Sequence, residues 1–298
     1  MSDSLQVDVY VAPVIPAVTG HQDPAKTMWS PICCTLIQGP TSAVLVDTPT
    51  TTELAKGLAE WVKRTACGKK LRYIYTTHAH GDHFFGNPVI VEEFPGVECV
   101  ATSFVVNGIK NDQLSEERLA RWNRLFPNKQ ISENQIVPNA LPPNGEFSID
   151  GYSLFGVDVA HSDTQFSSFL HVPSLELVVA GDIVYGECFQ HLGEANTTDK
   201  RKKWLDALDQ IASLKPSIVV PGHKRSSQSD GPYLIDATRQ YILAFERYLE
   251  KFEDADKVEE AMKFLYPNRW NDFILDFSAK MSVEQHLLTK TKATTSMI

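Results

Sequence analysis

The sequence lacks the features of a membrane-spanning or secreted protein. No run of about 18 or more apolar residues occurs among its 298 residues, so no transmembrane helix is expected. Residues 1–6 do not combine a basic segment with an apolar core, so no secretory signal is expected either. The five cysteines are odd in number and scattered, which is typical of a reducing compartment rather than of a disulfide framework. These absences predict a cytoplasmic location and no membrane partner.

The sequence also has little concentrated positive charge. Its 28 basic and 37 acidic residues give a formal net charge of −9, and the only basic run covers residues 200–203. That run opens an expected amphipathic helix, where a solvated face explains it. Nucleic-acid binding requires clustered Lys and Arg, so no nucleic-acid partner is expected. The chain is long enough for one large two-layer domain, and we expect a small-molecule substrate.

Four candidate metal ligands fall within six residues of one another. They follow directly on the apolar run 71–75 and are His78, His80, Asp82 and His83. A strand that rises ~3.3 Å per residue cannot aim four such side chains at one point, so the chain must turn here. Gly81 permits the turn, because glycine adopts positive φ without a Cβ clash. Histidine nitrogen and carboxylate oxygen are ligands that suit zinc in a catalytic, partly open site.

Three further candidate ligands each follow a short hydrophobic, β-branched segment, and they are His161, Asp182 and His223. In each case a strand is expected to end and a loop to begin at that residue. Alone, each has a structural interpretation, because a histidine near a strand end is usually hydrogen-bonded and Gly-Asp is usually a turn. Together with the cluster at 78–83 they form an ordered set of seven ligands at one end of successive strands, which favours a metal site.

The order His-x-His-x-Asp-His, a downstream histidine, Gly-Asp and Pro-Gly-His resembles the metallo-β-lactamase superfamily. The pattern is most similar to the branch that contains glyoxalase II and the bacterial acyl-homoserine lactonases, and it covers roughly residues 5 to 225. The resemblance implies an αββα sandwich, an α/β fold in which two mixed sheets face each other and helices cover the outside. We expect this domain over residues 1–230, with a C-terminal helical extension over residues 231–298 packed on it.

The resemblance also implies how two divalent metal ions would be held. The first metal would be bound by His78, His80 and His161, the second by Asp82, His83 and His223, with Asp182 bridging the two. Zinc is the expected metal, and iron and manganese also suit histidine and carboxylate ligands. Asp47 matches a position where the family keeps an aspartate behind the ligands, and a strand-end turn explains it equally well.

The implied reaction is hydrolysis. Two metals can share one water, lower its pKa towards 7 and polarise the carbonyl that it attacks, so a hydroxide held between them would open an ester, lactone, amide or lactam bond. Asp82 would bind a metal and also pass a proton to the leaving group, or would serve as a ligand only. Tyr185, three residues after Asp182, matches a tyrosine of the lactonase branch whose hydroxyl stabilises the oxyanion, and a buried structural tyrosine is the alternative.

Apolar residues near the motifs (Trp29, Phe84 and Phe85) favour a small, partly aromatic substrate. A thioester hydrolase like glyoxalase II is an alternative, but it would need a basic C-terminal patch, for which Lys280 and Lys290 are too few. A mononuclear iron persulfide dioxygenase of the same superfamily is another alternative, and it would not use the second-metal ligands that this sequence retains. A non-catalytic binding protein with this fold would usually lose ligands, and none is missing here.

Hydrophobic periodicity predicts the remaining elements. Strands are expected at residues 7–14, 32–37, 43–46 and 97–101, and a hairpin at 147–159 around an Asp150-Gly151 turn. Helices are expected at 52–65, 112–126 and 204–214 and from residue 232 to the C-terminus. The helix at 112–126 lies between the first ligand cluster and His161, and we expect it to form a wall of the substrate pocket.

Overall fold

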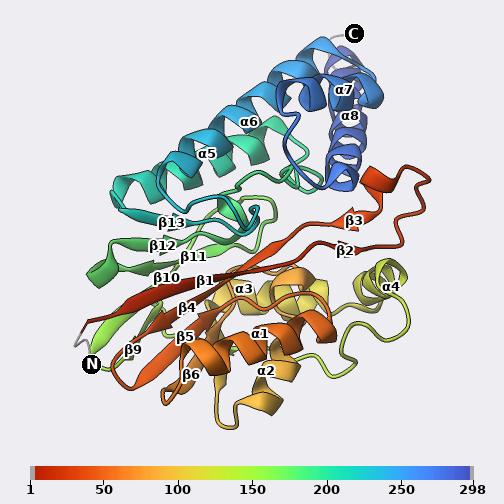
Figure 1. The fold of residues 1–298 in the computed structure, drawn as a ribbon. Helices are drawn as coiled ribbons and strands as arrows, with labels where there is room; N and C mark the ends of the chain where they lie inside the picture. Colours follow the sequence, from red (N-terminus) through yellow and green to blue (C-terminus); the bar gives the residue numbers. More distant parts are fainter. Residues whose placement is uncertain (1–3, 296–298) are drawn as a thin grey trace.

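Two β-sheets face each other in the computed structural model, which describes residues 4–295 (Figure 1). The first sheet contains, in spatial order, β1 (Gln6–Ala12), β4 (Ile32–Gln38), β5 (Ser42–Val46), β6 (Lys70–Tyr75), β7 (Glu98–Ala101) and β8 (Asn139–Ala140). The second contains β13 (Ile218–Val220), β12 (Leu177–Val179), β11 (Ser168–Val172), β10 (Tyr152–Asp158) and β9 (Glu146–Ile149). A short antiparallel pair is formed by β2 (Ile15–Pro16) and β3 (Met28–Trp29). Of the N-terminal segment discussed above, residues 1–3 lie outside the described part of the chain.

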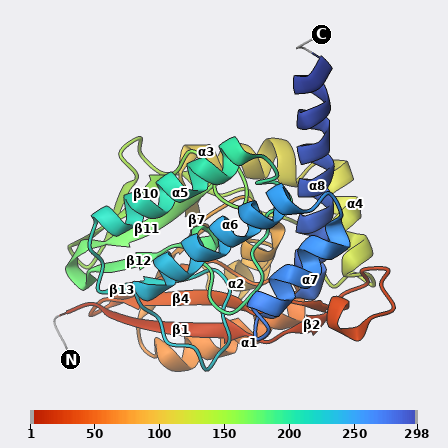
Figure 2. The ribbon, with the colours of Figure 1, turned by 90° about the horizontal axis from the view of Figure 1, so that it is seen from above.

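Helices cover both outer faces of this sandwich (Figures 1 and 2). The helices are α1 (Thr52–Thr65), α2 (Asn87–Glu93), α3 (Ser103–Gly108), α4 (Glu116–Leu125), α5 (Thr198–Ser213), α6 (Tyr233–Lys251), α7 (Ala255–Leu265) and α8 (Asp272–Thr295). Helices α1 and α2 lie on the first sheet, and α5 and α6 lie on the second. This is the αββα sandwich that the sequence predicted, with the additional C-terminal helices.

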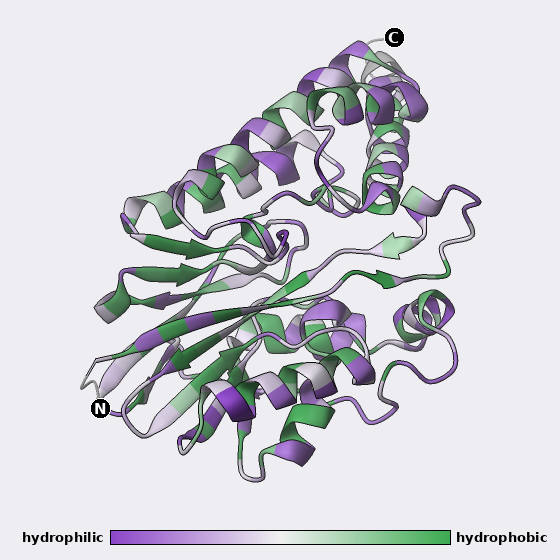
Figure 3. Ribbon diagram, in the orientation of Figure 1, coloured by the Kyte–Doolittle hydropathy of each residue, from purple (hydrophilic) through white to green (hydrophobic). Residues whose placement is uncertain are grey.

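The central strands β4, β5 and β12 are buried on both faces, because each sheet lies between the other sheet and a layer of helices, whereas the edge strands β1 and β9 carry exposed polar residues (Figure 3). In β4, Cys33 and Ile37 pack into the core between the two sheets. Cys34 and Leu36, which alternate with them, pack beneath α1. The two-residue period of a strand therefore divides one apolar segment between two cores, which fixes the order of the layers.

The strand directions bring the ligand-bearing loops to one edge. Strands β5 and β6 are parallel. Strand β11 pairs antiparallel with both β10 and β12, and β12 is parallel to β13, so β10, β12 and β13 all run the same way. The loops that follow β10, β12 and β13 therefore begin at the same edge of the second sheet. The three loops expected to carry ligands therefore share one edge, as the sequence predicted.

Several predicted elements are confirmed, and three predicted boundaries are wrong. Helix α1 has the predicted bounds, and the hairpin turns at Asp150-Gly151, where φ is +49° and +84°. The predicted strand 7–14 ends at Ala12, before a proline. The predicted helix 204–214 begins earlier, at Thr198, with Thr197 as its N-cap. The predicted helix 112–126 is interrupted, because α4 begins only after its own N-cap, Ser115.

The C-terminal helices share a core with the sandwich. One hydrophobic cluster joins Phe169 of β11 and Trp204 of α5 with Phe245 of α6, Met262 of α7 and Leu275 of α8. The end of α8 projects away from the body of the molecule (Figure 2). Packing on the domain agrees with the expected extension, while a division at residue 230 stays a prediction. None of the helices formed by residues 4–295 combines the length and apolar character needed to cross a bilayer.

Candidate metal centre

The first ligand cluster lies in the loop that follows β6. His78 and His80 occupy the loop itself, and a short 3-10 turn, Gly81–His83, brings Asp82 and His83 into the same region. Gly81 does not have the positive φ that the sequence suggested. Instead a Cβ at this position would overlap the ring of Phe85, so glycine is needed for space rather than for backbone conformation.

The other ligand candidates come from the second sheet. Asp163 lies in the loop after β10, Asp182 in the 3-10 turn Gly181–Ile183 after β12, and His223 in the loop after β13. Gly222 allows the last two loops to approach, because a Cβ there would overlap the carboxylate of Asp182. Two carboxylates and one imidazole from the edge of the second sheet therefore lie opposite the ligand cluster that follows β6.

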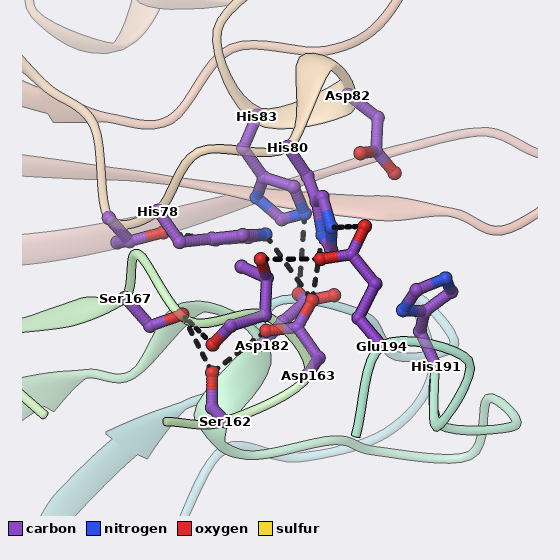
Figure 4. Close-up of polar contacts among 12 residues, drawn as sticks. His78, His80, Asp82, His83, Ser162, Asp163, Ser167, Asp182, His191 and Glu194 are labelled. Carbon is purple, nitrogen blue, oxygen red and sulfur yellow. Dashed lines mark hydrogen bonds and ion pairs between the residues drawn. The ribbon is translucent and has the colours of Figure 1, made fainter. Parts of the chain in front are cut away.

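These side chains form two groups that can each hold a metal ion, of which Figure 4 shows the first, and a third group, Asp47, His78 and His83, overlaps them. The first group is His78, His80, Asp163 and Asp182, and the second is Asp82, His83 and His223. Within each group the ligand atoms lie within 4.8 Å of one another, and all the residues are buried. Asp182 also reaches the second group, since its carboxylate oxygens lie 3.3 Å from Nε2 of His83 and 3.2 Å from Nε2 of His223.

The structure separates His161 from the other predicted ligands. It belongs to none of the candidate metal-binding groups among residues 4–295, and its Nδ1 lies 2.6 Å from the carbonyl oxygen of Ser162. Asp163 instead lies beside His78 and His80. The geometry differs from the sequence expectation because the loop turns at Ser162, whose N–H donates to the carbonyl of Thr164 at 2.9 Å, and the turn brings the later side chain inwards.

Each histidine of the second group has one ring nitrogen fixed and the other directed at the group. Nδ1 of His83 lies 2.9 Å from Asp47, and Nδ1 of His223 lies 2.8 Å from the carbonyl oxygen of Pro31. In both cases Nε2 is left to face the ligands. Metal-binding histidines are oriented in this way by a carboxylate or carbonyl on the far nitrogen. Asp47 also accepts hydrogen bonds from the N–H and hydroxyl of Thr77, so it serves as an orienting group behind the ligands.

Three buried polar atoms converge at the centre. Nε2 of His78 has no hydrogen-bond partner among the described residues, and leaving such an atom unsatisfied costs about 1–3 kcal/mol. Oδ2 of Asp163 and Oδ1 of Asp182 face imidazole nitrogens, those of His80 at 2.7 Å and of His83 at 3.3 Å. Imidazole and carboxylate groups that converge in this way fit the donor set of a divalent metal ion.

The electrostatics of the centre favour metal binding. Burial, together with the neighbouring imidazole of His83, lowers the pKa of His78 to about 4, so this ring is neutral at pH 7. Burial would also lower the pKa of His80, but Asp163 raises it well above the usual value. For Asp182, burial raises the pKa, yet the imidazoles around it hold the pKa well below the usual range. Ionised carboxylates among buried imidazoles can exchange the imidazole protons for a metal ion.

A pocket opens beside the two groups, and His80, Asp82, Asp182 and His223 form part of its wall. Its apolar wall is mostly aromatic, with Trp29, Trp122, Phe189 and Phe273, and also includes Leu125 and Ile274. Helix α4 contributes to this wall along its length, as predicted for the segment 112–126. The start of α8 contributes as well, so the C-terminal extension reaches the pocket. Phe84 and Phe85 do not line it, because both are fully buried in the core beneath.

The two residues predicted to be catalytic, Asp82 and Tyr185, both line the pocket. Oδ2 of Asp82 accepts a hydrogen bond from Nε1 of Trp29 at 3.0 Å. Tyr185 is buried, and its hydroxyl donates a short hydrogen bond to Oδ2 of Asp182. The same hydroxyl oxygen lies 3.5 Å from the backbone nitrogen of His191. The Tyr185 proton is therefore directed at the shared carboxylate rather than into the open pocket.

Sequence reasoning missed Asp163 and also Glu194. Oε1 of Glu194 lies 3.7 Å from Nε2 of His80 (Figure 4). It also accepts a hydrogen bond from Arg118 at 2.8 Å, and Oε2 accepts one from Thr164 at 2.7 Å. Glu194 therefore ties the far side of His80 to α4 and to the loop that carries Asp163. No sequence motif marks this residue, because the contact spans 76 residues to Arg118.

The comparisons with known proteins agree with this architecture. The profile of the metallo-beta-lactamase superfamily matches residues 28–223. A metallo-beta-lactamase family protein from Thermus thermophilus is similar in structure, with a TM-score of 0.60, 17% identity and 93% of each chain covered. A metallo-beta-lactamase from Pontibacter korlensis gives a TM-score of 0.55 at 19% identity, covering 82% of this chain and 96% of that one.

A third structure, the metallo-beta-lactamase FIM-1 from Pseudomonas aeruginosa in its mono-zinc form, gives a TM-score of 0.54 at 17% identity. The match covers 82% of this chain and 92% of that chain. No curated protein matches the sequence significantly. At these identities the solved structures establish a shared fold.

Proposed function

Because the chain belongs to the metallo-beta-lactamase superfamily, we propose that it is a dinuclear metal-dependent hydrolase that opens an ester, lactone, amide or lactam bond. The observation that carries the proposal is that two groups of buried ligands meet at Asp182. One group alone would support a single metal, but the shared carboxylate can fix the spacing of two.

The residues of this chain would hold the two ions in a defined way. His78, His80 and Asp182 would bind the first ion, and Asp82, His83 and His223 the second, with Asp182 common to both. Zinc is the proposed metal, with iron and manganese as alternatives. Divalent ions bound here would supply a water of lowered pKa and would polarise the carbonyl of the substrate.

The protein side chains would orient the substrate and transfer a proton to the leaving group. Trp29 holds one oxygen of Asp82 at 3.0 Å, so the carboxylate is fixed at the pocket wall, where it can pass a proton to the leaving group. The aromatic wall excludes water and accommodates an apolar or aromatic acyl group. Trp29 and Trp122 stack edge to face with centroids 5.3 Å apart, which makes this wall rigid.

The second ligand group separates this proposal from its main competitor. A mononuclear iron persulfide dioxygenase would not need Asp82, His83 and His223 to converge, whereas here all three are buried and within reach of one another. For a glyoxalase II-like thioester hydrolase, the pocket lining would need a basic patch for glutathione carboxylates. The pocket has two arginines, and one of them is already paired with Glu194.

Metal analysis tests the proposal directly. We expect about two metal ions per chain in the purified protein by elemental analysis, and about one in His223→Ala, with turnover strongly reduced. His171→Ala, a change of a half-buried histidine on β11 outside both groups, is the matched control and should retain both ions. A wild-type protein with a single tight metal, and full activity in His223→Ala, would contradict the dinuclear proposal and favour the dioxygenase.

The remaining arginine of the pocket indicates an anionic substrate. Arg121 lines the wall over the ring of Phe277, with its guanidinium carbon 4.7 Å from the ring centroid. Within residues 4–295 no ion pair is formed by Arg121, whereas Arg118 on the same helix is paired with Glu194. Burial, together with Arg118, lowers the pKa of Arg121, and the carboxylate of Glu194 offsets this only in part. We propose that it binds a carboxylate of the substrate.

Arg121→Ala should therefore raise KM for a carboxylated aromatic lactone by about 10–100-fold, the loss expected for a hydrogen bond to a charged group. KM for the uncharged analogue should change little, and kcat should be retained for both. Arg124→Ala, on the exposed side of the same helix, is the matched control. Equal effects of Arg121→Ala on the charged and uncharged substrates would show that Arg121 only packs.

A further inference from the structure

We propose that Asp163, and not His161, is the third protein ligand of the first metal. The two metal positions then have equivalent donor sets, each with two histidines, one carboxylate of its own and a share of Asp182. This inference rests on the proposed dinuclear centre and names a ligand of that centre that the family motif in the sequence does not indicate.

The position of Asp163 is that of a ligand. Its side chain is fully buried, and Oδ2 lies 2.7 Å from Nδ1 of His80 and 3.8 Å from Nε2 of His78. Oδ1 accepts a hydrogen bond from the hydroxyl of Ser162 at 2.8 Å, which fixes the carboxylate and leaves Oδ2 directed at the two histidines (Figure 4).

The position of His161 is not that of a ligand. Its ring lies outside both ligand groups and outside the pocket wall. The loop is also held in this arrangement from outside. The hydroxyl of Thr164 donates to Glu194 at 2.7 Å, and the carbonyl of Thr164 accepts from Ser167 at 3.2 Å. To bring His161 to the metal, the loop would have to break these contacts and withdraw Asp163.

The substitution of an oxygen ligand for a nitrogen ligand changes the charge of the centre. With Asp163, the protein supplies three carboxylates (Asp82, Asp163 and Asp182) and four imidazoles to the two ions. Two divalent ions carry +4, so the sum with three carboxylates is +1, whereas His161 in place of Asp163 would leave +2. Compared with imidazole, carboxylate ligands favour harder ions such as Mn²⁺. We expect the first position to bind Mn²⁺ better, relative to Zn²⁺, than a three-histidine site would.

The test compares two matched variants without measuring any reaction. Asp163→Asn keeps the shape of the side chain and removes its charge, and His161→Gln removes the alternative imidazole. After metal loading and dialysis, elemental analysis should give about two ions per chain for the wild type and His161→Gln, and about one for Asp163→Asn. Competition with a chromophoric chelator measures the affinity of each site for its metal ion. In Asp163→Asn one of the two metal affinities should fall by more than about 100-fold, which exceeds the loss typical of removing an outer hydrogen-bond partner.

A third variant keeps the inference testable if Asp163→Asn does not fold. Asp163→His restores a ligand of the other type, so it should retain two Zn²⁺ ions while its preference for Mn²⁺ over Zn²⁺ falls relative to the wild type. The assignment would be overturned if His161→Gln lost one ion while Asp163→Asn retained both. It would also be overturned if His161→Gln lost one ion while Asp163→His kept the metal preference of the wild type.

The outcome is independent of the proposed reaction. If the expected metal contents are found but no ester, lactone, amide or lactam is hydrolysed, the assignment of Asp163 stands and the proposed function fails. If His161→Gln alone loses an ion while the wild type hydrolyses these bonds, the function stands and the assignment fails.

Discussion

Asp182→Asn is expected to release at least one of the two metal ions and to lower turnover by on the order of 10³-fold, the upper end of the loss seen on removing one electrostatic group. Asp182 is the carboxylate of the first group that reaches the second, with oxygen–nitrogen distances of 3.3 Å to His83 and 3.2 Å to His223. An amide keeps the shape of the side chain but loses the charge that the two cations share.

Elemental analysis and steady-state kinetics of the same preparation measure this effect. Asp158→Asn is the control, because Asp158 is an exposed carboxylate at the end of β10 that lies outside both groups. It should keep both ions and normal turnover. An Asp182→Asn protein that retained two ions and wild-type kinetics would remove Asp182 from the centre, and with it the reason for placing two metals there.

The layers of the fold could be predicted because they depend on local patterns. The alternation in β4 and the apolar face of α1, capped by Thr51, can each be recognised within a window of about ten residues. The Asp150-Gly151 turn is similarly local, since its two residues alone provide the positive φ angles of the hairpin. Six of the seven predicted ligands are brought together for the same reason, because each lies where a strand or its loop meets one edge of the sheets.

Asp163 could not be predicted in this way because loops have no period. His161 and Asp163 are two residues apart and both follow the same strand, so either could face the metals. The choice depends on a turn at Ser162 and on the distant contact of Thr164 with Glu194. A histidine is the more familiar ligand, and the sequence pattern therefore favoured His161.

Only some of the aromatic residues expected at the pocket line its wall, for a related reason. Trp29 and Phe85 were both expected near the substrate, yet only Trp29 lines the pocket. Phe85 lies in the core instead, where its ring packs against Trp122 with centroids 5.4 Å apart. Gly81 is linked to the same packing, since the Phe85 ring occupies the space of its missing Cβ. Aromatic content indicates that a core or a pocket is present, but the assignment of each ring depends on tertiary contacts.

Tyr185→Phe tests whether the predicted catalytic tyrosine acts on the substrate or on the metal centre. Its hydroxyl donates to Asp182, and this is the carboxylate shared by both groups. Removal of an outer hydrogen-bond partner typically costs about 10–100-fold in metal affinity. We therefore expect Tyr185→Phe to weaken metal binding by about this amount. At saturating metal, kcat should fall by less than about tenfold, which is well below the fall in kcat that follows removal of an oxyanion-stabilising donor.

The opposite result would assign the hydroxyl to the reaction itself. A tyrosine that stabilises the oxyanion should leave metal affinity unchanged on replacement by phenylalanine and should lower kcat by up to about 10²–10³-fold. Chelator competition and kinetics at saturating metal therefore give different patterns for the two roles. Tyr241→Phe provides the matched control, because Tyr241 is also fully buried but lies outside both the pocket wall and the ligand groups. If Tyr185→Phe behaves like this control, the hydroxyl has neither role.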